Sequence, residues 1–443
     1  MKKNPTNRRD FFRQSSLIAG GLIASPMLSQ ATNYFSGSDD TIKIALIGCG
    51  GRGTGAAMQA LSSRQNVKLV AMADAFRDRL DGCYKELTKE KSDNPRGSVK
   101  DKVDVPEEHK FTGLDAYQKA IPLADVVILT TPPGFRPIHF EEAIRLNKHV
   151  FMEKPVATDP AGIQRVLATA EEAKKKQRNV VVGLQRHYQN SYRELFKRKD
   201  KIGDLVSAQA WWNNDGVWVN KRKPEQTEME YQMRNWYYFV WLCGDHITEQ
   251  HIHNIDVINW FKGSYPVKAQ GMGGREVRKG KEYGEIFDHH FVEFHYADGF
   301  ILNSQCRHIP GTMSRVDELL VGTKGKIQCG EANIVTHSGK TLYQYDKQLE
   351  NDPYQTEHDE LFAAIANGEY KFADAENGAK SSMTSILGRM ATYSGQVIEW
   401  DKAINSGIDI HPKTYDFNAP PPVLPDADGW YAVPVPGKTK YKL

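Results

Sequence analysis

The sequence predicts an α/β protein in which a doubly wound parallel sheet is followed by an α+β domain with a large, open and mostly antiparallel sheet. The first domain is predicted by apolar strand-like runs that alternate with helical segments up to residue 155. The second is predicted by strand-like runs with few helices between them, over residues 156–400. A length of 443 residues is also too great for one ordinary domain.

In the first domain, apolar runs rich in β-branched residues predict buried strands at residues 41–47, 67–73, 124–129 and 149–152. Helices are expected at residues 54–61 and 140–146. In the second domain, strands are expected at residues 179–183, 206–212, 267–271, 291–296, 300–305 and 315–322. Helical patterns cover residues 161–176 and 363–397, and a Pro-rich extension follows at 401–443.

The charge of the chain is nearly balanced, with 58 basic and 55 acidic residues and a net charge of +3. This balance predicts neither a nucleic acid nor an anionic membrane as a partner. The five cysteines are scattered and form no C-x-x-C pair, which argues against a disulfide framework and against a zinc–thiolate site.

The N-terminus has the order of an export signal at residues 1–31, followed by a polar linker at 32–40. The pair Arg8-Arg9 precedes Phe-Phe and a short apolar run, and small residues follow around Ala31. We therefore predict a twin-arginine signal and export to the periplasm. No later apolar stretch is long enough to predict a membrane span. Because this route moves folded proteins, a cofactor could be bound inside the cell and carried out.

A glycine-rich turn follows the first strand and opens a helix, as in a dinucleotide-binding (Rossmann) domain. Gly48 permits the tight turn, Gly50 lets the backbone approach a pyrophosphate, and Gly53 lets the helix pack closely on the strand. Asp74 ends the second strand, where a carboxylate binds ribose hydroxyls and repels a 2′-phosphate. We therefore predict NAD rather than NADP, although Arg77 lies near enough to weaken this preference. The alternative is a glycine turn without a ligand.

The first domain ends in Glu153-Lys154-Pro155, and Thr131-Pro132-Pro133 and His139 precede it. Together with the glycine loop, these residues resemble the Gfo/Idh/MocA family of oxidoreductases over roughly residues 41–400. The resemblance implies hydride transfer between a sugar or polyol carbon and a nicotinamide. It also implies that Lys154 contacts the substrate hydroxyl and the cofactor, where an ammonium lowers the cost of deprotonating an alcohol. The alternative for Lys154 is a surface lysine at a strand end.

By the same resemblance and the loop pattern, the residues expected to hold the nucleotide are Gly48, Gly50, Gly51, Arg52, Gly53, Asp74, Thr131, Pro132, His139, Glu153 and Lys154.

The family also places an acid four positions before a histidine on a helix, which corresponds here to Glu249 and His253. At 100° per residue, His246, Glu249, Gln250 and His253 share one helix face, while His251 points away. His253 is the expected base, and Glu249 is expected to orient it. The family more often has Asp at position 249 and Gly at 251, which leaves the base uncertain. No metal is predicted, because the spacing does not match a zincin helix; structural histidines remain an alternative.

Aromatic and amide-rich segments suggest a sugar site, because sugar rings stack on aromatic side chains while polar groups read the hydroxyls. The residues expected to bind substrate are Arg186, Tyr188, Trp236, His246, Glu249 and His253.

The sequence therefore predicts an exported NAD-dependent dehydrogenase acting on a sugar or glycoside. Because no free NAD pool exists outside the cytoplasm, we expect tightly held NAD that a second substrate recycles. One alternative is NAD-dependent glycoside hydrolysis by transient oxidation and elimination; another is a non-catalytic sugar-binding protein. Analogy with the family also suggests a homo-oligomer, a dimer or tetramer.

Overall fold

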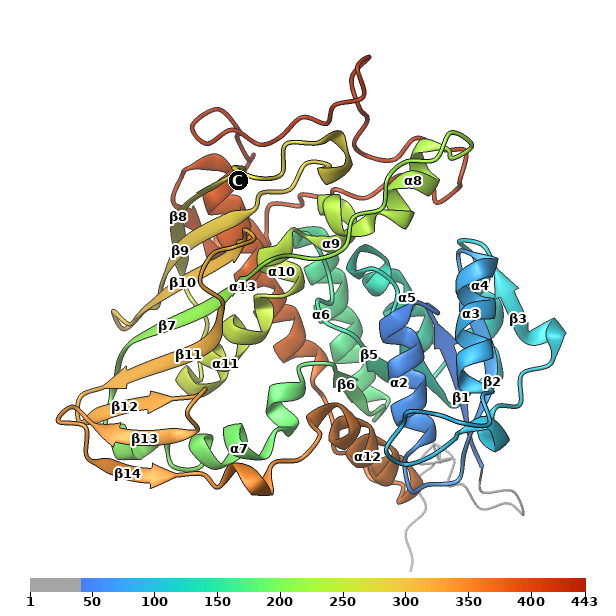
Figure 1. The fold of residues 1–443 in the computed structure, drawn as a ribbon, viewed down its shortest axis with the longest axis horizontal. Helices are drawn as coiled ribbons and strands as arrows, with labels where there is room; N and C mark the ends of the chain where they lie inside the picture. The colour runs from blue at the N-terminus through green and yellow to red at the C-terminus, as the bar shows by residue number, and fades with distance from the viewer. Residues whose placement is uncertain (1–40) are drawn as a thin grey trace, which may run out of the picture. The chain divides into compact units, whose positions relative to one another are not determined.

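The computed structural model describes residues 41–443, so the predicted signal at residues 1–31 and the linker at 32–40 lie outside the described residues. The first part is a six-stranded parallel sheet with the strand order β3-β2-β1-β4-β5-β6 (Figure 1). Its strands are β1 (Ile42–Ile47), β2 (Val67–Asp74), β3 (Lys110–Thr112), β4 (Val126–Leu129), β5 (His149–Met152) and β6 (Val180–Val182). The connecting helices are α2 (Gly51–Leu61), α3 (Arg77–Leu87), α4 (Ala116–Ala120), α5 (Arg136–Arg145) and α6 (Pro160–Lys175).

The second part is a nine-stranded sheet with the order β14-β13-β12-β11-β7-β10-β9-β8-β15. Every neighbouring pair is antiparallel except β7 and β10, which run parallel. The strands are β7 (Leu205–Asn214), β8 (Lys268–Gly274), β9 (His289–His295), β10 (Ile301–His308), β11 (Arg315–Gly322), β12 (Gly325–Gln328), β13 (Asn333–Thr336), β14 (Thr341–Gln344) and β15 (Ile398–Glu399). The predicted fold class is confirmed.

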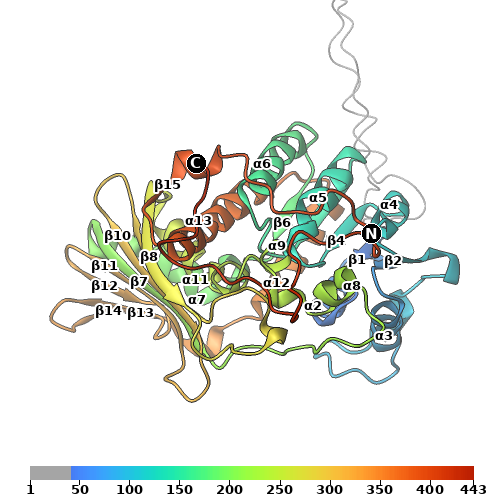
Figure 2. The ribbon, with the colours of Figure 1, turned by 90° about the horizontal axis from the view of Figure 1, so that it is seen from above.

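The helices of the second part are α7 (Asn190–Phe196), α8 (Glu228–Arg234), α9 (Val240–Cys243), α10 (His246–Glu249), α11 (Ile252–Lys262), α12 (Pro353–Ala366), α13 (Ala375–Ser394) and α14 (Trp400–Ile404). Within residues 41–443, no helix is both long and apolar enough to span a membrane. Figure 2 shows α11 and α13 along one face of the nine-stranded sheet, while no helix of residues 41–443 lies over the opposite face.

The predicted domain boundary at residue 155 differs from the observed architecture. Strand β6 pairs with β5, so the parallel sheet continues past α6 to residue 182. Helix α13 then packs against α6 as well as against β8 and β9. One apolar core therefore runs from Val182 on the first sheet through Ile386 to Phe294 on the second. This shared core holds the two sheets in a fixed relation, which a site built from both requires.

The C-terminal segment, residues 405–443, contains neither helix nor strand. It runs across α8 and α9 at the top of the molecule (Figure 1). Its side chains Tyr415, Phe417 and Tyr431 join an apolar cluster with residues of those helices. The predicted Pro-rich extension is therefore a packed part of the fold.

Candidate active site

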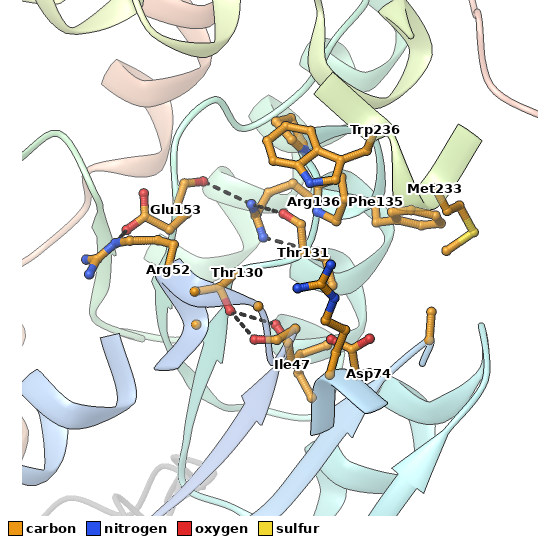
Figure 3. Close-up of a pocket in the computed structure, with 18 of the residues that line it drawn as sticks. Ile47, Arg52, Asp74, Thr130, Thr131, Phe135, Arg136, Glu153, Met233 and Trp236 are labelled. Carbon is orange, nitrogen blue, oxygen red and sulfur yellow. Dashed lines mark hydrogen bonds and ion pairs between the residues drawn. The ribbon is translucent and has the colours of Figure 1, made fainter. Parts of the chain in front are cut away.

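A cavity of about 730 Å³ lies at the carboxyl ends of the parallel strands and is closed on its other side by residues of the second part. Ligands of open α/β sheets bind at this edge of the sheet. The cavity is lined by every residue predicted to hold the nucleotide: Gly48, Gly50, Gly51, Arg52, Gly53, Asp74, Thr131, Pro132, His139, Glu153 and Lys154. Figure 3 shows a part of this wall.

The glycine loop has the geometry of an anion cradle. Gly48 has φ +98°, and a Cβ added at Gly53 would lie 1.9 Å from the carbonyl oxygen of Gly48, so neither position accepts a side chain. Gly50 and Gly51, in contrast, face open space. Helix α2 begins there with no side-chain cap and no acidic residue in its first turn. Its free N–H groups and positive dipole end are therefore available to a pyrophosphate.

Asp74 lies at the end of β2 with both carboxylate oxygens held by the backbone. Its Oδ2 accepts from the Cys49 amide at 2.6 Å and its Oδ1 from the Phe76 amide at 2.9 Å. Burial raises the pKa of this carboxyl group. Arg77 pairs with Asp81 and Glu107 on the surface and does not line the cavity, so it does not counter the preference for NAD.

Glu153 anchors the glycine loop to the end of β5. The Nε of Arg52 donates to Glu153 Oε1 at 2.5 Å (Figure 3). The Nη2 of Arg52 lies 3.4 Å from the buried carboxylate of Glu357. Burial and the nearby charge of Glu153 hold the pKa of Glu357 well above its usual range. The guanidinium also lies 5.1 Å from the ring centre of Tyr354, which lines the cavity.

Arg136, which the sequence reasoning missed, ties together the loops that follow strands β4 and β5. It is almost fully buried and donates to the carbonyl oxygens of Thr131, at 2.6 Å, and Glu153, at 2.9 Å (Figure 3). The hydroxyl of Thr131 lies 3.2 Å from Nδ1 of His139. Burial and then Arg136 lower the pKa of His139 to about 3, so its ring is neutral.

Lys154 crosses the cavity and contacts the second part of the chain. Its Nζ donates to the main-chain oxygen of Glu249 at 2.7 Å and lies 3.3 Å from Glu249 Oε1. Both side chains are largely buried, at 12% and 14% exposed. The pair brings a cationic donor to a place that a substrate hydroxyl can reach beside the cofactor loop.

His253 lines the same cavity, but Glu249 does not orient it as predicted. The carboxylate of Glu249 pairs with Lys154, and Nδ1 of His253 is buried without a hydrogen-bond partner among the described residues. The imidazole instead stacks on Trp212, with ring centres 5.9 Å apart. Burial, with Lys154, Arg186 and Arg52 as the next causes, holds its pKa well below the usual range. The ring is therefore neutral and able to accept a proton.

The predicted single helix face through His246 and His253 is broken. Helix α10 ends at Glu249, and the amide of His251 donates to the oxygen of His246, five residues back. This wider turn rotates the following residues relative to a regular helix. Glu249, Gln250 and His253 reach the cavity, whereas His246 does not.

Three residues predicted to bind substrate do not line this cavity. Arg186 is paired with buried Glu318 in the core. The hydroxyl of Tyr188 donates to Asp374 at 2.9 Å, on the wall of a separate small cavity. His246 is fully buried against Asp245, which lies 2.8 Å from its Nδ1. Polar side chains that the fold pairs internally are not free to read a ligand.

Trp236 does line the cavity, together with side chains that the predicted substrate set omitted. These are Trp212, Trp218, Asn220, Met233, Arg234, Gln250 and Tyr354. The aromatic runs around Trp212 and Trp236 pointed to this wall, but no local pattern distinguishes a tryptophan in a cavity from one in the core.

Residues 42–183 match the model of an oxidoreductase family with an NAD-binding Rossmann fold. Inositol 2-dehydrogenase of Gluconacetobacter diazotrophicus is 30% identical over 162 residues, which are 36% of this chain and 42% of that relative, less than half of its length. Inositol 2-dehydrogenase of Cereibacter sphaeroides is 23% identical over 355 residues, covering 78% of this chain and 92% of that relative.

Scyllo-inositol dehydrogenase from Lactobacillus casei, solved with bound NAD(H) and scyllo-inositol, superposes with a TM-score of 0.59 at 18% identity, over 82% of this chain and 99% of that chain. This likeness extends the shared fold through both sheets. The loop, the carboxylate at position 74 and the family match agree on NAD as the cofactor of the first domain.

Proposed function

We propose that this chain, an oxidoreductase whose first domain is the NAD-binding Rossmann fold of the Gfo/Idh/MocA family, exchanges hydride between a hydroxyl-bearing carbon of a sugar or glycoside and a nicotinamide. The observation that carries the proposal is the Lys154–Glu249 contact. It sets an ammonium group at the junction of the nucleotide loop and the wall that holds His253. The inositol dehydrogenases among the relatives, whose named substrate is a cyclic polyol, support this class of substrate.

The chemistry follows from the charges of the lining groups. NAD, when bound, supplies the hydride acceptor. The Lys154 ammonium donates to the substrate hydroxyl and stabilises negative charge that develops on its oxygen. His253 is held neutral by burial and is the group that takes the hydroxyl proton. Glu249 offsets the charge of Lys154 and fixes its position.

The walls on the substrate side suit a carbohydrate. Trp212, Trp218 and Trp236 line the cavity, and Trp218 is 45% exposed. The rings of Trp218 and Trp236 meet edge to face, with centres 5.8 Å apart. Flat aromatic faces with few charges beside them stack on the C–H faces of sugar rings.

We further propose that the protein is exported by the twin-arginine route with its NAD already bound. The signal pattern around Arg8-Arg9 motivates this, and those residues lie outside the described ones. Retention of the cofactor is supported by the C-terminal segment, which packs behind the cavity wall. The Phe417 ring lies 5.6 Å from that of Phe76, and the Tyr415 ring lies 5.4 Å from that of Phe135. Both Phe76 and Phe135 line the cavity.

The same segment fixes helix α8, which carries the lining residues Met233 and Arg234. The Gln232 amide donates to the oxygen of Val423 at 2.6 Å, and the Tyr431 hydroxyl donates to Glu228 at 2.6 Å. A wall braced in this way opens rarely, so we expect NAD to dissociate slowly.

The proposal is tested on protein purified without added nucleotide. Mass spectrometry of the denatured protein should find about one NAD per chain. Sugars and glycosides are then screened for reduction of that NAD at 340 nm, with product analysis. A keto-sugar with reduced cofactor supports the proposal. A released monosaccharide with unchanged NAD would instead identify a glycoside hydrolase, an alternative that the named dehydrogenase relatives do not favour.

We also propose a homo-oligomer formed through the face of the nine-stranded sheet that no helix covers. The strand register sets Met272 and Phe291 side by side on this face. Met272 is 71% exposed. Exposed apolar side chains on an open sheet are suited to burial against a second copy. Light scattering should give a dimer or tetramer, and Met272→Lys should shift the mass towards the monomer.

A further inference from the structure

Gln250 lies at the substrate end of the cavity with its carboxamide held in one orientation. The Nε1–H of Trp212 donates to its Oε1 at 2.9 Å, and Nε2 of His308 lies 2.9 Å from the same oxygen. An indole N–H is only a donor, so the atom facing Trp212 must be the amide oxygen. The NH₂ group of Gln250 is thereby placed on the other side.

The tautomer of His308 is fixed by a second buried donor. Arg278 Nη2 lies 2.8 Å from His308 Nδ1, and both residues are buried. Because a guanidinium only donates, Nδ1 accepts, and the proton of the neutral imidazole is on Nε2. Burial, with His246 and Arg278 as further causes, holds the pKa of His308 well below its usual range. His308 therefore donates to Gln250, and two donors occupy the amide oxygen.

The NH₂ group of Gln250 has no hydrogen-bond acceptor among residues 41–443, although Gln250 lines the cavity. It lies next in sequence to Glu249, whose carbonyl oxygen holds Lys154, and three positions before His253. A donor whose other end is fixed by Trp212 and His308 loses little freedom when it binds a ligand, which is the condition for selective recognition.

We propose that Gln250 is a specificity-determining residue that donates a hydrogen bond to a substrate oxygen other than the oxygen that is oxidised. The inference rests on the proposed function and adds a requirement to it. The substrate must carry an acceptor oxygen, as a hydroxyl, ether or ring oxygen, near the reacting carbon. Polyols and sugars have this pattern, and simple alcohols do not.

The test uses the purified holoenzyme, the best sugar from the screen and its single-deoxy derivatives. For the wild-type enzyme, removal of one particular hydroxyl should lower kcat/KM about tenfold, the effect of one neutral hydrogen bond. Gln250→Leu should lower kcat/KM for the parent sugar by about the same factor. In that variant the same deoxy derivative should be turned over as well as the parent sugar, because the interaction is already absent.

Gln250→Glu provides a sharper variant. One carboxylate oxygen still accepts from Trp212 and His308, while the other presents an acceptor where the NH₂ group was. Repulsion from the substrate oxygen should lower kcat/KM about 100-fold, mostly through KM. Gln396→Glu makes the same charge change at an exposed site away from the cavity and is the matched control. Bound NAD and the melting temperature show whether each variant is folded.

Two results separate the possible failures. If the wild-type holoenzyme oxidises no sugar, the proposed function fails, and the inference fails with it. If the wild-type enzyme is active but Gln250→Leu keeps every deoxy penalty unchanged, the proposed function stands and the role of Gln250 is overturned.

Discussion

The Nζ of Lys154 donates to the main-chain oxygen of Glu249 at 2.7 Å, across 95 positions of sequence. Lys154 follows strand β5 of the first sheet, and Glu249 ends helix α10 of the second part. The ammonium is therefore positioned by both parts of the chain. The backbone oxygen of Glu249 fixes the position of the ammonium. The carboxylate oxygen Oε1 of Glu249, 3.3 Å from Nζ, adds a negative charge that balances it.

The first prediction concerns Lys154 itself. Lys154→Met retains the apolar stem but removes the donor, so kcat should fall by about 100-fold or more, as for loss of one donor to a developing oxyanion. Lys154→Arg should recover little, because a planar guanidinium cannot occupy the place of a compact ammonium. Steady-state kinetics with the best sugar measures both effects.

Bound NAD provides the control for that experiment, because the glycine loop, Asp74 and the other predicted nucleotide residues line the cavity besides Lys154. Both variants should copurify with NAD at the wild-type stoichiometry. Turnover by Lys154→Met at the wild-type rate would contradict the proposed chemistry.

The second prediction concerns pH and His253. Burial depresses the pKa of this imidazole, so it stays neutral as pH falls from 7 through 6.5 and becomes protonated only well below that. A base that must be neutral loses activity only when it is protonated. The kcat/KM profile should therefore stay flat on its acidic side to well below pH 6.5, and His253→Asn should lower the plateau about 100-fold. A fall in kcat/KM centred at pH 6.5 in the wild-type enzyme would assign the base to another group.

The parts of the fold that were predictable are those with strong local patterns. The strand, glycine turn and helix around Gly48, and the carboxylate of Asp74, have fixed spacing because a dinucleotide imposes it. Strand β6 was recognised as a strand, but its place in the first sheet depends on its pairing with β5, which no local pattern encodes. The domain boundary was therefore drawn too early.

The candidate site divides in the same way. The predicted residues beside the nucleotide loop line the cavity, whereas Arg186 and Tyr188 are held away from it by Glu318 and Asp374, which lie far along the chain. His246 is fully buried beside its neighbour Asp245. The hydrogen bond from the His251 amide to the His246 oxygen also breaks the regular helical period on which the prediction of a common face depended. Arg136 was missed because its acceptors are backbone oxygens of two separate loops. The sequence pattern does not show that the fold brings these two loops to the same arginine.

The third prediction concerns retention of the cofactor. Phe417→Ala removes the ring that packs behind Phe76, so the cavity wall should open more often. We expect NAD to dissociate from this variant about tenfold faster, because loss of a half-buried aromatic contact costs roughly 1 kcal/mol. The rate is measured by diluting each holoenzyme into an excess of an apo-dehydrogenase that captures released NAD. The NAD that stays bound to this protein is then determined over time. Trp430→Ala alters an exposed aromatic residue of the same segment and should leave the rate unchanged.

The fourth prediction concerns His411, which joins the C-terminal segment to the start of α6. Its Nδ1 lies 3.1 Å from Asp159, the N-cap residue of that helix, and 3.2 Å from Asp409. Burial alone would lower its pKa, but the hydrogen bonds to these two carboxylates outweigh burial and raise the pKa to about 9. The unfolded chain has the ordinary value of about 6.5.

Because the folded state binds this proton more tightly, the stabilisation is fully present below pH 6.5 and is lost as pH rises through about 9. His411→Gln should therefore lower the free energy of unfolding by about 3 kcal/mol at pH 6 and by much less at pH 10. Urea unfolding of both proteins at several pH values measures this difference. If the free energies of unfolding of the two proteins differ by the same amount from pH 6 to pH 10, the charge interaction of His411 with Asp159 and Asp409 does not stabilise the segment. His411 then contributes to stability by packing alone.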